Sequence, residues 1–160
     1  MATLSSCFRR WPVADMIEIS DSPIDTAELQ RSLINPAAGG YCAFEGWVRN
    51  ENEGHVVERL EYEAYKPLAI TEGEKVLAEA RAKFPYLDAR CVHRAGLLEI
   101  GECAVWIGVA SAHRDEAFKA CRYIIDEIKV RLPIWKKEHY ANGDSGWVNC
   151  ERCAQHGIAD

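Results

Sequence analysis

The chain has 160 residues, of which 48% are hydrophobic and 28% charged, and its formal net charge is −6. This length suits one domain, and the composition is typical of a globular protein with a packed core. The acidic balance argues against non-specific binding to nucleic acid or anionic lipid, because both require clustered cations. Its longest apolar runs, such as 104–110, fall well short of the roughly 20 residues that span a bilayer.

The two ends of the sequence are expected to be tails on a domain at 16–150. Residues 1–15 contain two arginines but lack the apolar segment of a secretory signal, so we do not expect export. This stretch also has some features of an organellar presequence, and Met16 is an alternative start. Residues 151–160 form the second tail. The seven cysteines lack the spacing of a disulfide scaffold, which favours reduced thiols in a cytoplasmic protein.

The first elements are predicted from short patterns. A β-type run at 16–19 is followed by turn and N-cap residues and by a short helix at 26–34. A strand rich in aromatic and β-branched residues is predicted at 41–48. It ends in the polar loop 49–54, which is a candidate functional tip.

The next strand and helix are predicted at 57–65 and 68–84. The strand alternates, which indicates one buried face and one face that is solvated or in an interface; Val57, Arg59, Glu61 and Glu63 share one side, and Glu58, Leu60, Tyr62 and Ala64 the other. The helix starts after Pro67 and stops at Pro85. Its expected apolar face contains Leu68, Ile70, Val76, Leu77 and Ala80.

The second half predicts a hairpin, a long helix and a loop. Apolar strands at 88–95 and 103–110, joined through Gly96 and a turn, are expected at the centre of a sheet. A helix at 114–131 presents Ala117, Cys121, Ile124 and Ile128, widened by Phe118, Ile125 and Leu132. The segment 134–147 is expected to be an ordered functional loop anchored by Trp135. Together the elements indicate an α+β fold with a mainly antiparallel sheet.

Cationic residues near element ends are the candidate site. His113 and Arg114 begin the long helix, where free backbone N–H groups favour an anionic ligand. Lys129 lies at the edge of the apolar stripe and can reach the rim of a pocket. The plainer alternatives are that His113 caps the helix, that Arg114 pairs with an acid, and that Lys129 extends into water.

Two further segments supply charge. Lys136, Lys137 and Glu138 follow a buried-type segment and are a candidate second cationic wall. Arg49 ends the strand that contains Trp47 and Val48, and its planar fork suits a phosphate or carboxylate. The alternatives are that the lysines are solvated and that Arg49 pairs with a neighbouring glutamate, either Glu51 or Glu53.

Metal and cofactor chemistry is not expected. Cys150, Cys153 and His156 suggest zinc, but a single C-x-x-C with one histidine lacks a fourth ligand. The sequence contains no hydrolase elbow, Walker loop or dinucleotide fingerprint. Anion binding by cations is therefore the sharpest chemical prediction.

Five segments, in order, resemble the catalytic-subunit family of molybdopterin synthase, the MoaE family: GWVRNENEG, LEYEAYKPLA, VHRAGLLEIGE, VASAHRDEAF and IKVRLPIWKKE. The resemblance spans about 17–147. Within it, HRDEAF and PIWKKE are the most specific pair. The seven cysteines play no part in these motifs' chemistry.

The resemblance implies a fold of the α/β-hammerhead type and a cytoplasmic sulfurtransferase. The implied assembly is a homodimer within a heterotetramer, with a small ubiquitin-like sulfur carrier at each end. The carrier's C-terminal Gly-Gly thiocarboxylate would supply sulfur to cyclic pyranopterin monophosphate (precursor Z). Two transfers would form the dithiolene of molybdopterin, a step of molybdenum cofactor biosynthesis.

The resemblance also implies roles for residues. The family's substrate-binding positions fall on Trp47, Val48, Arg49, His113, Arg114, Lys129, Lys136, Lys137 and Glu138. Lys129 would be the key catalytic lysine, with Lys136 beside it in catalysis. Lys129 would assist proton transfer while Arg49, Arg114 and Lys136 hold negative charge. His113 is assigned to binding. Trp47 departs from a family position where a smaller or charged side chain is also found.

Two other classes of function stay open at this point. One is a non-catalytic scaffold or paralogue that keeps the dimer and binds carriers, although the retained His-Arg pair and key lysines argue against it. The other is a simple module that binds a phosphorylated ligand without a carrier. Turnover with a carrier would distinguish both from the enzyme.

Overall fold

The computed structural model describes residues 15–149. Its elements are β1 (Met16–Ser20), α1 (Thr26–Ser32), β2 (Gly40–Trp47), β3 (Glu51–Asn52), β4 (His55–Ala64), α2 (Lys66–Lys83), β5 (Asp88–Arg94), β6 (Gly96–Glu99), β7 (Cys103–Ser111), α3 (Arg114–Arg131), β8 (Ile134–Tyr140) and β9 (Ser145–Asn149). The presequence-like stretch before Asp15, the tail at 151–160 and the possible zinc ligands Cys150, Cys153 and His156 fall outside the described residues. Within 15–149, no helix has both the length and the apolar composition needed to cross a bilayer.

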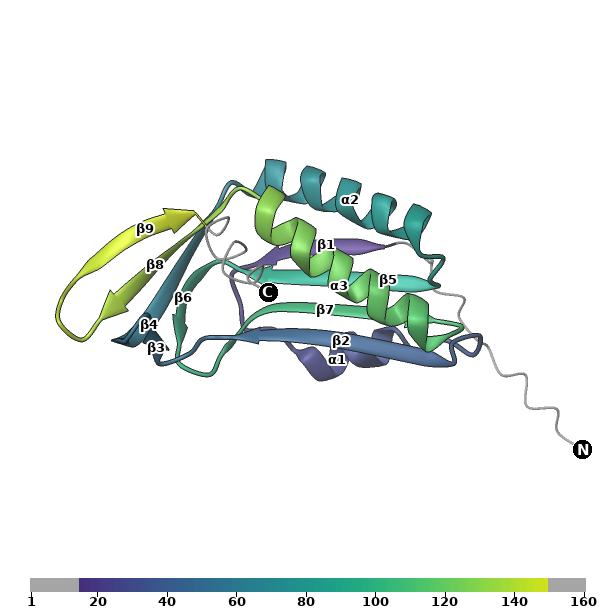
Figure 1. The fold of residues 1–160 in the computed structure, drawn as a ribbon, viewed down its shortest axis with the longest axis horizontal. Coiled ribbons are helices and arrows are strands. Elements are labelled where there is room, and N and C mark those ends of the chain that lie inside the picture. Colours follow the sequence, from purple (N-terminus) through teal and green to yellow (C-terminus); the bar gives the residue numbers. More distant parts are fainter. Residues whose placement is uncertain (1–14, 150–160) are drawn as a thin grey trace, which may run out of the picture.

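The first sheet has the strand order β1–β5–β7–β2. β1 runs parallel to β5, and the other neighbours are antiparallel. Helices α2 and α3 cover one face, and α1 lies on the other (Figure 1). Nearly every residue of β7 is buried, as expected for a central strand with an uninterrupted apolar run. The predicted central position of the strands at 88–95 and 103–110 is therefore confirmed.

Helix α3 has the bounds that the sequence predicts. His113 is its N-cap in an extended conformation; acids occupy the first turn and cations the last, which complements the helix dipole. Ala117, Ala120, Cys121, Ile124 and Ile128 are buried. Phe118 was expected to widen the apolar stripe, but it is 59% exposed because the buried stripe is centred on Ala117, Cys121 and Ile124.

Helix α2 packs closely on the sheet and on α3. A Cβ atom on Gly73 would lie 2.0 Å from Cδ1 of Ile17, so a glycine here allows α2 to approach β1. Arg131, in the last turn of α3, donates to both carboxylate oxygens of Glu79 on α2, at 2.6 and 3.1 Å. This bidentate pair holds the end of α3 in place. Leu68, expected on the buried face, is exposed, and Ala69 is buried in its place.

The second sheet has the order β3–β4–β8–β9, with β6 also paired to β4, and every pair is antiparallel. It projects from one end of the first sheet (Figure 1). The loop expected at 134–147 was a wrong prediction, since β8 and β9 form a hairpin there. β4 offers β8 a pairing edge, and Gly143, with φ of 86°, closes the turn. Trp135 is 37% exposed, and Ile134 is the buried anchor.

Two strands depart from their simple sequence patterns. In β4 the register shifts between Val57 and Arg59, so Val57 is buried together with Leu60 and Tyr62 instead of sharing a face with Arg59. The hairpin predicted between β5 and β7 is real, but β6 lies in its connection and pairs with β4. The connection between β5 and β7 in the first sheet therefore contributes β6 to the second sheet and links the two sheets.

Candidate active site

The predicted cations lie at both ends of α3. His113 and Arg114 are exposed at its start, and the His113 side chain makes no cap hydrogen bond. A Cβ atom on Gly40 would lie 3.0 Å from Cα of Arg114, so the start of β2 lies against the start of α3. Lys129 lies in the last turn, about 22 Å along the axis from Arg114. One chain therefore does not bring His113 and Arg114 to Lys129.

Lys129 is half-buried, and its charge acts on two buried groups of β5. Burial, and then Lys129, lower the pKa of His93 from 6.5 to about 3. Burial also raises the pKa of Cys91 to about 12, against the opposing effect of Lys129. The charge of Lys129 thus affects the titration of buried groups of β5, so its ammonium group is not directed solely into solvent.

His93 is neutral, and its tautomer follows from its contacts. Its Nδ1 lies 2.8 Å from the carbonyl oxygen of Arg94, and because a carbonyl only accepts, Nδ1 carries the proton. Nε2 is then a hydrogen-bond acceptor. The His93 ring also packs edge-to-face on Tyr62 of β4, with centroids 4.9 Å apart.

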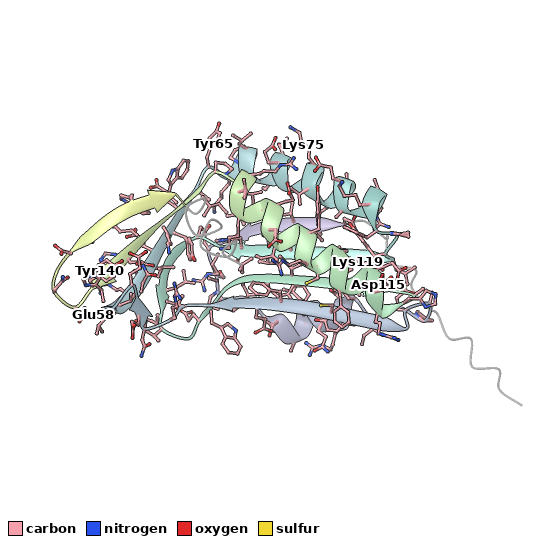
Figure 2. All side chains as sticks on the ribbon, in the orientation of Figure 1. Glu58, Tyr65, Lys75, Asp115, Lys119 and Tyr140 are labelled. Carbon is pink, nitrogen blue, oxygen red and sulfur yellow. The ribbon has the colours of Figure 1, made fainter. Side chains whose placement is uncertain are left out.

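A polar network centred on the buried Glu138 lies at the second sheet. We call Arg49, Asn52, Lys136, Glu138 and Tyr140 the Glu138 network. Lys136 Nζ donates to Glu138 Oε1 at 2.9 Å, and Asn52 Nδ2 and the Tyr140 hydroxyl donate to Oε2, the former at 2.9 Å. Arg49 Nη2 donates to Asn52 Oδ1 at 2.8 Å. Figure 2 shows Tyr140 on this sheet, away from α3.

The ion pair at the centre of this network is largely withdrawn from water. The side chains of Lys136 and Glu138 are only 13% and 10% exposed. Burial alone would raise the pKa of Glu138, but hydrogen bonds from Tyr140, Lys136 and Asn52 outweigh it and hold this pKa below its ordinary value of 4.5. Glu138 is therefore a carboxylate near pH 7, and Lys136 is held beside it.

Tyr62 connects the network to Lys129. In the pairing of β4 with β8, Tyr62 lies directly opposite Lys136, and its ring contacts His93, which lies in the field of Lys129. Both lysines thus belong to the region where the two sheets join. Arg49 is linked through Asn52 to Glu138 and so to Lys136, whereas Lys129 acts on His93, which packs on Tyr62.

The end of β2 sets the position of Arg49. A bulge falls at Gly46 and Trp47, and the Val48 backbone then donates to Glu102 O and accepts from Gly101 N. Val48 itself is 5% exposed. Trp47 is mainly exposed, and its indole N–H donates to Glu45. Arg49 Nη2 donates to Asn52 Oδ1, a partner that the sequence did not suggest.

The comparison with known proteins shows the family of the chain. Residues 19–131 match the family model described as MoaE protein. The chain belongs to the MoaE family. This membership confirms the resemblance that the sequence motifs indicate.

Individual relatives agree with the family match. The chain is 45% identical, over 131 residues, to the molybdopterin synthase catalytic subunit of Thermoplasma volcanium, covering 82% of this chain and 96% of that protein. The human molybdopterin synthase catalytic subunit is 37% identical over 139 residues, which cover 87% and 73% of the two chains. Both alignments cover more than four fifths of this chain.

Solved structures give the same answer for the fold. The molybdopterin synthase structure from Staphylococcus aureus superposes with a TM-score of 0.78 and 40% identity, covering 82% of this chain and 95% of that one. A complex of subunits 1 and 2 of molybdopterin-converting factor from Helicobacter pylori superposes with a TM-score of 0.66 and 25% identity, covering 79% and 86%. The predicted α+β class, of the hammerhead type, is confirmed.

Seen against the MoaE-family expectations, Lys137 stands apart. Successive residues of a strand point to opposite faces, so Lys137 lies on the face of β8 away from Lys136 and Glu138. Its Nζ lies 5.7 Å from the centre of the Trp147 ring. In this chain Lys137 contacts an aromatic side chain rather than the Glu138 network.

Sequence reasoning missed four residues of this region: Asn52, Tyr62, His93 and Tyr140. Tyr140 follows Lys136 and Glu138 at two-residue steps, a signal that is visible only once 134–140 is read as a strand. Asn52 lay in a loop that was singled out only as a whole. Within 15–149, no cluster of three or more His, Cys, Asp or Glu side chains is arranged to hold a metal ion.

Proposed function

We propose that this chain is the catalytic subunit of a molybdopterin synthase. It would transfer sulfur from the thiocarboxylated C-terminus of a small ubiquitin-like carrier to cyclic pyranopterin monophosphate, forming the dithiolene of molybdopterin. The observation that carries this proposal is the largely buried Lys136–Glu138 pair, linked to Arg49 through Asn52, in a chain whose relatives are molybdopterin synthase catalytic subunits.

We assign the proposed roles of the site residues from their charge and their position. Arg49 and Lys136 hold the phosphate and the negative charge that develops as sulfur adds. Lys129 moves protons at the reacting centre, since a lysine next to buried groups can act as general acid and base. Glu138 holds Lys136 in place through their ion pair. Trp47, Val48 and Lys137 form the surroundings of this site in the proposal.

Sulfur arrives on the partner, so no cysteine of this chain has to act as a nucleophile. Burial raises the pKa of Cys91 to about 12 and that of Cys103 to about 11, and it raises the pKa of Cys121 further. These groups stay protonated at neutral pH and are poor nucleophiles. This supports a carrier as the sulfur source, as does the two-subunit complex of the Helicobacter pylori relative.

We further propose that a second copy of the chain completes the site. Arg114 and Lys129 lie about 22 Å apart on one α3, too far for a single pterin to contact both. Two α3 helices that lie antiparallel across a two-fold axis would bring the partner's helix start to Lys129. His113 and Arg114 would then bind substrate held mainly by the other chain.

One surface suits this contact. β2 is the edge strand of the first sheet, and α3 packs over it. Phe44 of β2 is 40% exposed and Phe118 of α3 is 59% exposed, which leaves aromatic area uncovered beside an open strand edge. An antiparallel β2 pair would also bring the partner's Gly40, with the adjoining Arg114, towards Arg49.

We also infer the domain limits and location that accompany this function. The catalytic domain is proposed to occupy 16–150, between tails at 1–15 and 151–160. A cytoplasmic location is supported by the four free cysteine thiols among the described residues. No metal or other cofactor is required by the proposed sulfur transfer.

The test of the function is reconstitution. The purified chain would be incubated with thiocarboxylated carrier and cyclic pyranopterin monophosphate, and molybdopterin measured as its fluorescent oxidation product. We expect product with the wild type and a loss of about 100-fold or more in Lys129→Ala. Lys119→Ala, on the solvent side of the same helix, should stay near wild type. Carrier binding without product would favour the scaffold instead.

A mixing experiment tests the shared site. Lys129→Ala and Arg114→Ala would each be inactive alone, but a mixed dimer has one site with both defects and one with neither. Co-expression at equal amounts should restore about a quarter of the wild-type activity. Mixed dimers that stay inactive would show that the site is not shared. Lys129 and Arg114 would then act in the same protomer, or Arg114 would not belong to the site.

A further inference from the structure

We propose that Asn52 is a positioning residue that fixes the spacing between Arg49 and Lys136 through Glu138, and thereby sets how tightly the pterin substrate binds. The proposal rests on the function proposed above and adds a residue that the family motifs did not single out. Asn52 is half-buried and is the link between Arg49 and the Lys136–Glu138 pair.

The orientation of the Asn52 amide follows from its neighbours. An arginine only donates and a carboxylate only accepts, so Oδ1 must face Arg49 and Nδ2 must face Glu138. The distances are 2.8 Å and 2.9 Å, and Nδ2 also lies 3.5 Å from the Tyr140 hydroxyl. No flipped amide satisfies both partners.

The backbone holds Asn52 at this point. The short strand β3 pairs Asn52 with His55, so Glu53 and Gly54 form a two-residue turn. Both have positive φ, 49° and 81°, as in the tight hairpin turns that match strand twist. A non-glycine residue at positive φ is uncommon and occurs often near functional sites. The turn therefore presents the Asn52 side chain in a fixed direction.

The chemistry requires an amide rather than another small polar group. Asn52 occupies Glu138 Oε2 and leaves Oε1 to Lys136, so it orients the carboxylate as well as Arg49. A carboxylate in its place would still accept from Arg49 but would repel Glu138. An alkyl group would remove the acceptor that faces Arg49 and one of the three donors that face Glu138, which breaks the link between Arg49 and the Lys136–Glu138 pair.

The test uses Asn52→Asp, which keeps the shape of the side chain but replaces the donor that faces Glu138 with a negatively charged acceptor. Asn142→Asp is the control, because Asn142 lies in the exposed β8–β9 turn and bonds only to its neighbour Asp144. We expect Asn52→Asp to lower kcat/KM by about 10- to 100-fold at pH 8, mainly through KM for the pterin. The control should stay within about two-fold.

A pH profile separates positioning from a merely structural role. The pKa of an aspartate is ordinarily about 3.9, and the adjacent Glu138 carboxylate raises it. A protonated carboxyl can donate again, so the deficit of Asn52→Asp should shrink as the pH is lowered from 8 to 5, whereas a damaged fold would not recover. A loss that is independent of pH and equal to the loss of folded protein in urea unfolding would overturn the proposal. So would kinetics identical to those of Asn142→Asp.

A second readout does not depend on turnover. Carboxyl NMR of glutamate-labelled protein should show the pKa of Glu138 below 4.5 in the wild type and higher in Asn52→Leu. The substitution removes one of the three side-chain donors to Glu138 and leaves those of Lys136 and Tyr140. An unchanged Glu138 titration would refute the role of Asn52 even in an active enzyme. Absence of product from the wild type, with the expected titration shift, would instead refute the proposed function alone.

Discussion

The two sheets of this molecule bury different kinds of side chain. The first sheet and its helices bury a large apolar cluster, in which Cys91, Ile107 and Ile124 are fully inaccessible, although strands β5 and β7 also bury His93, Arg94 and Ser111. The second sheet buries a lysine and a glutamate together with their hydrogen-bond partners. Burying apolar area stabilises a fold, whereas burying an ion pair costs desolvation that the pair only partly recovers. The first sheet therefore supports the fold, and the second organises charge.

The candidate site lies where these two parts meet. Lys129 comes from the helix layer of the first sheet and Lys136 from the second sheet. Two contacts set their relation: Arg131 fixes the end of α3 to Glu79, and His93 packs on Tyr62. Changes in the apolar core should thus affect mainly stability, and changes at Lys129 or Lys136 should affect mainly chemistry.

The largest expected effect on stability is in the helix layer. Ile124→Ala removes a fully buried side chain from α3 and should lower the free energy of unfolding by about 2–5 kcal/mol. Turnover per folded molecule should stay unchanged, because Ile124 is an apolar side chain of the hydrophobic core and supplies no polar group to the site. Urea unfolding and the reconstituted assay, run on the same samples, measure both. A stable but inactive variant would break the division between the two sheets.

The junction should make stability depend on pH. Because the pKa of His93 falls from 6.5 to about 3 on folding, the unfolded chain binds a proton that the folded chain does not between these values. Stability is then greatest above pH 6.5 and falls with pH, by about 2 kcal/mol between pH 6.5 and 5 from this group alone. His93→Gln should remove this part of the slope in urea unfolding at the two pH values. An identical slope in both proteins would show that His93 does not titrate this way.

A smaller effect is expected in the Glu138 network. Tyr140→Phe removes one donor to Glu138 and should cost about 1 kcal/mol at pH 7, the usual net value of a hydrogen bond. Since the pKa of Glu138 is lowered in the folded state, this stabilisation is present above pH 4.5 and is lost as the pH falls through the folded value. Unfolding curves of both proteins at pH 7 and pH 4 should therefore differ more at pH 7.

The smallest effect should be on the exposed face of α3. Lys119 pairs with Asp115 one turn earlier, and both side chains point into solvent (Figure 2). Lys119→Ala should leave the urea midpoint and the activity unchanged, because exposed helix pairs contribute little. Lys119→Ala and Lys129→Ala each remove one positive charge from the same helix. A difference in activity between them is therefore due to the position of the lysine and not to the loss of charge. A clear loss in Lys119→Ala would show that the exposed end of α3 also takes part.

Much of the first sheet could be predicted from local patterns. The bounds of α3 and the strands at 88–95 and 103–110 follow from apolar periodicity and from helix-end residues, which report burial directly. The second sheet could not be predicted in this way. The segment 134–147 mixes aromatics and charges because β8 buries an ion pair, so its strand pattern does not alternate between apolar and polar residues.

The residues of the candidate site also fall into two groups, those that the sequence could identify and those that it could not. The motifs identified Arg49, Lys129, Lys136 and Glu138 by type and order, since charge and family resemblance are properties of the sequence. They did not separate Lys137 from its neighbours, which requires knowing that β8 is a strand. They also did not reveal Asn52 or His93, whose importance depends on partners distant in the chain.

The sequence by itself determined the family, the α+β class and the set of cations available for an anionic substrate. The tertiary structure decided which of these cations meet, through the bulge in β4, the excursion of β6 and the pairing of β4 with β8. The physical reason is that periodicity records whether a side chain is buried, whereas contacts between distant strands depend on how two sheets are joined. Asn52 shows this most clearly: its two hydrogen-bond partners come from the end of β2 and from β8, and only the fold brings them together.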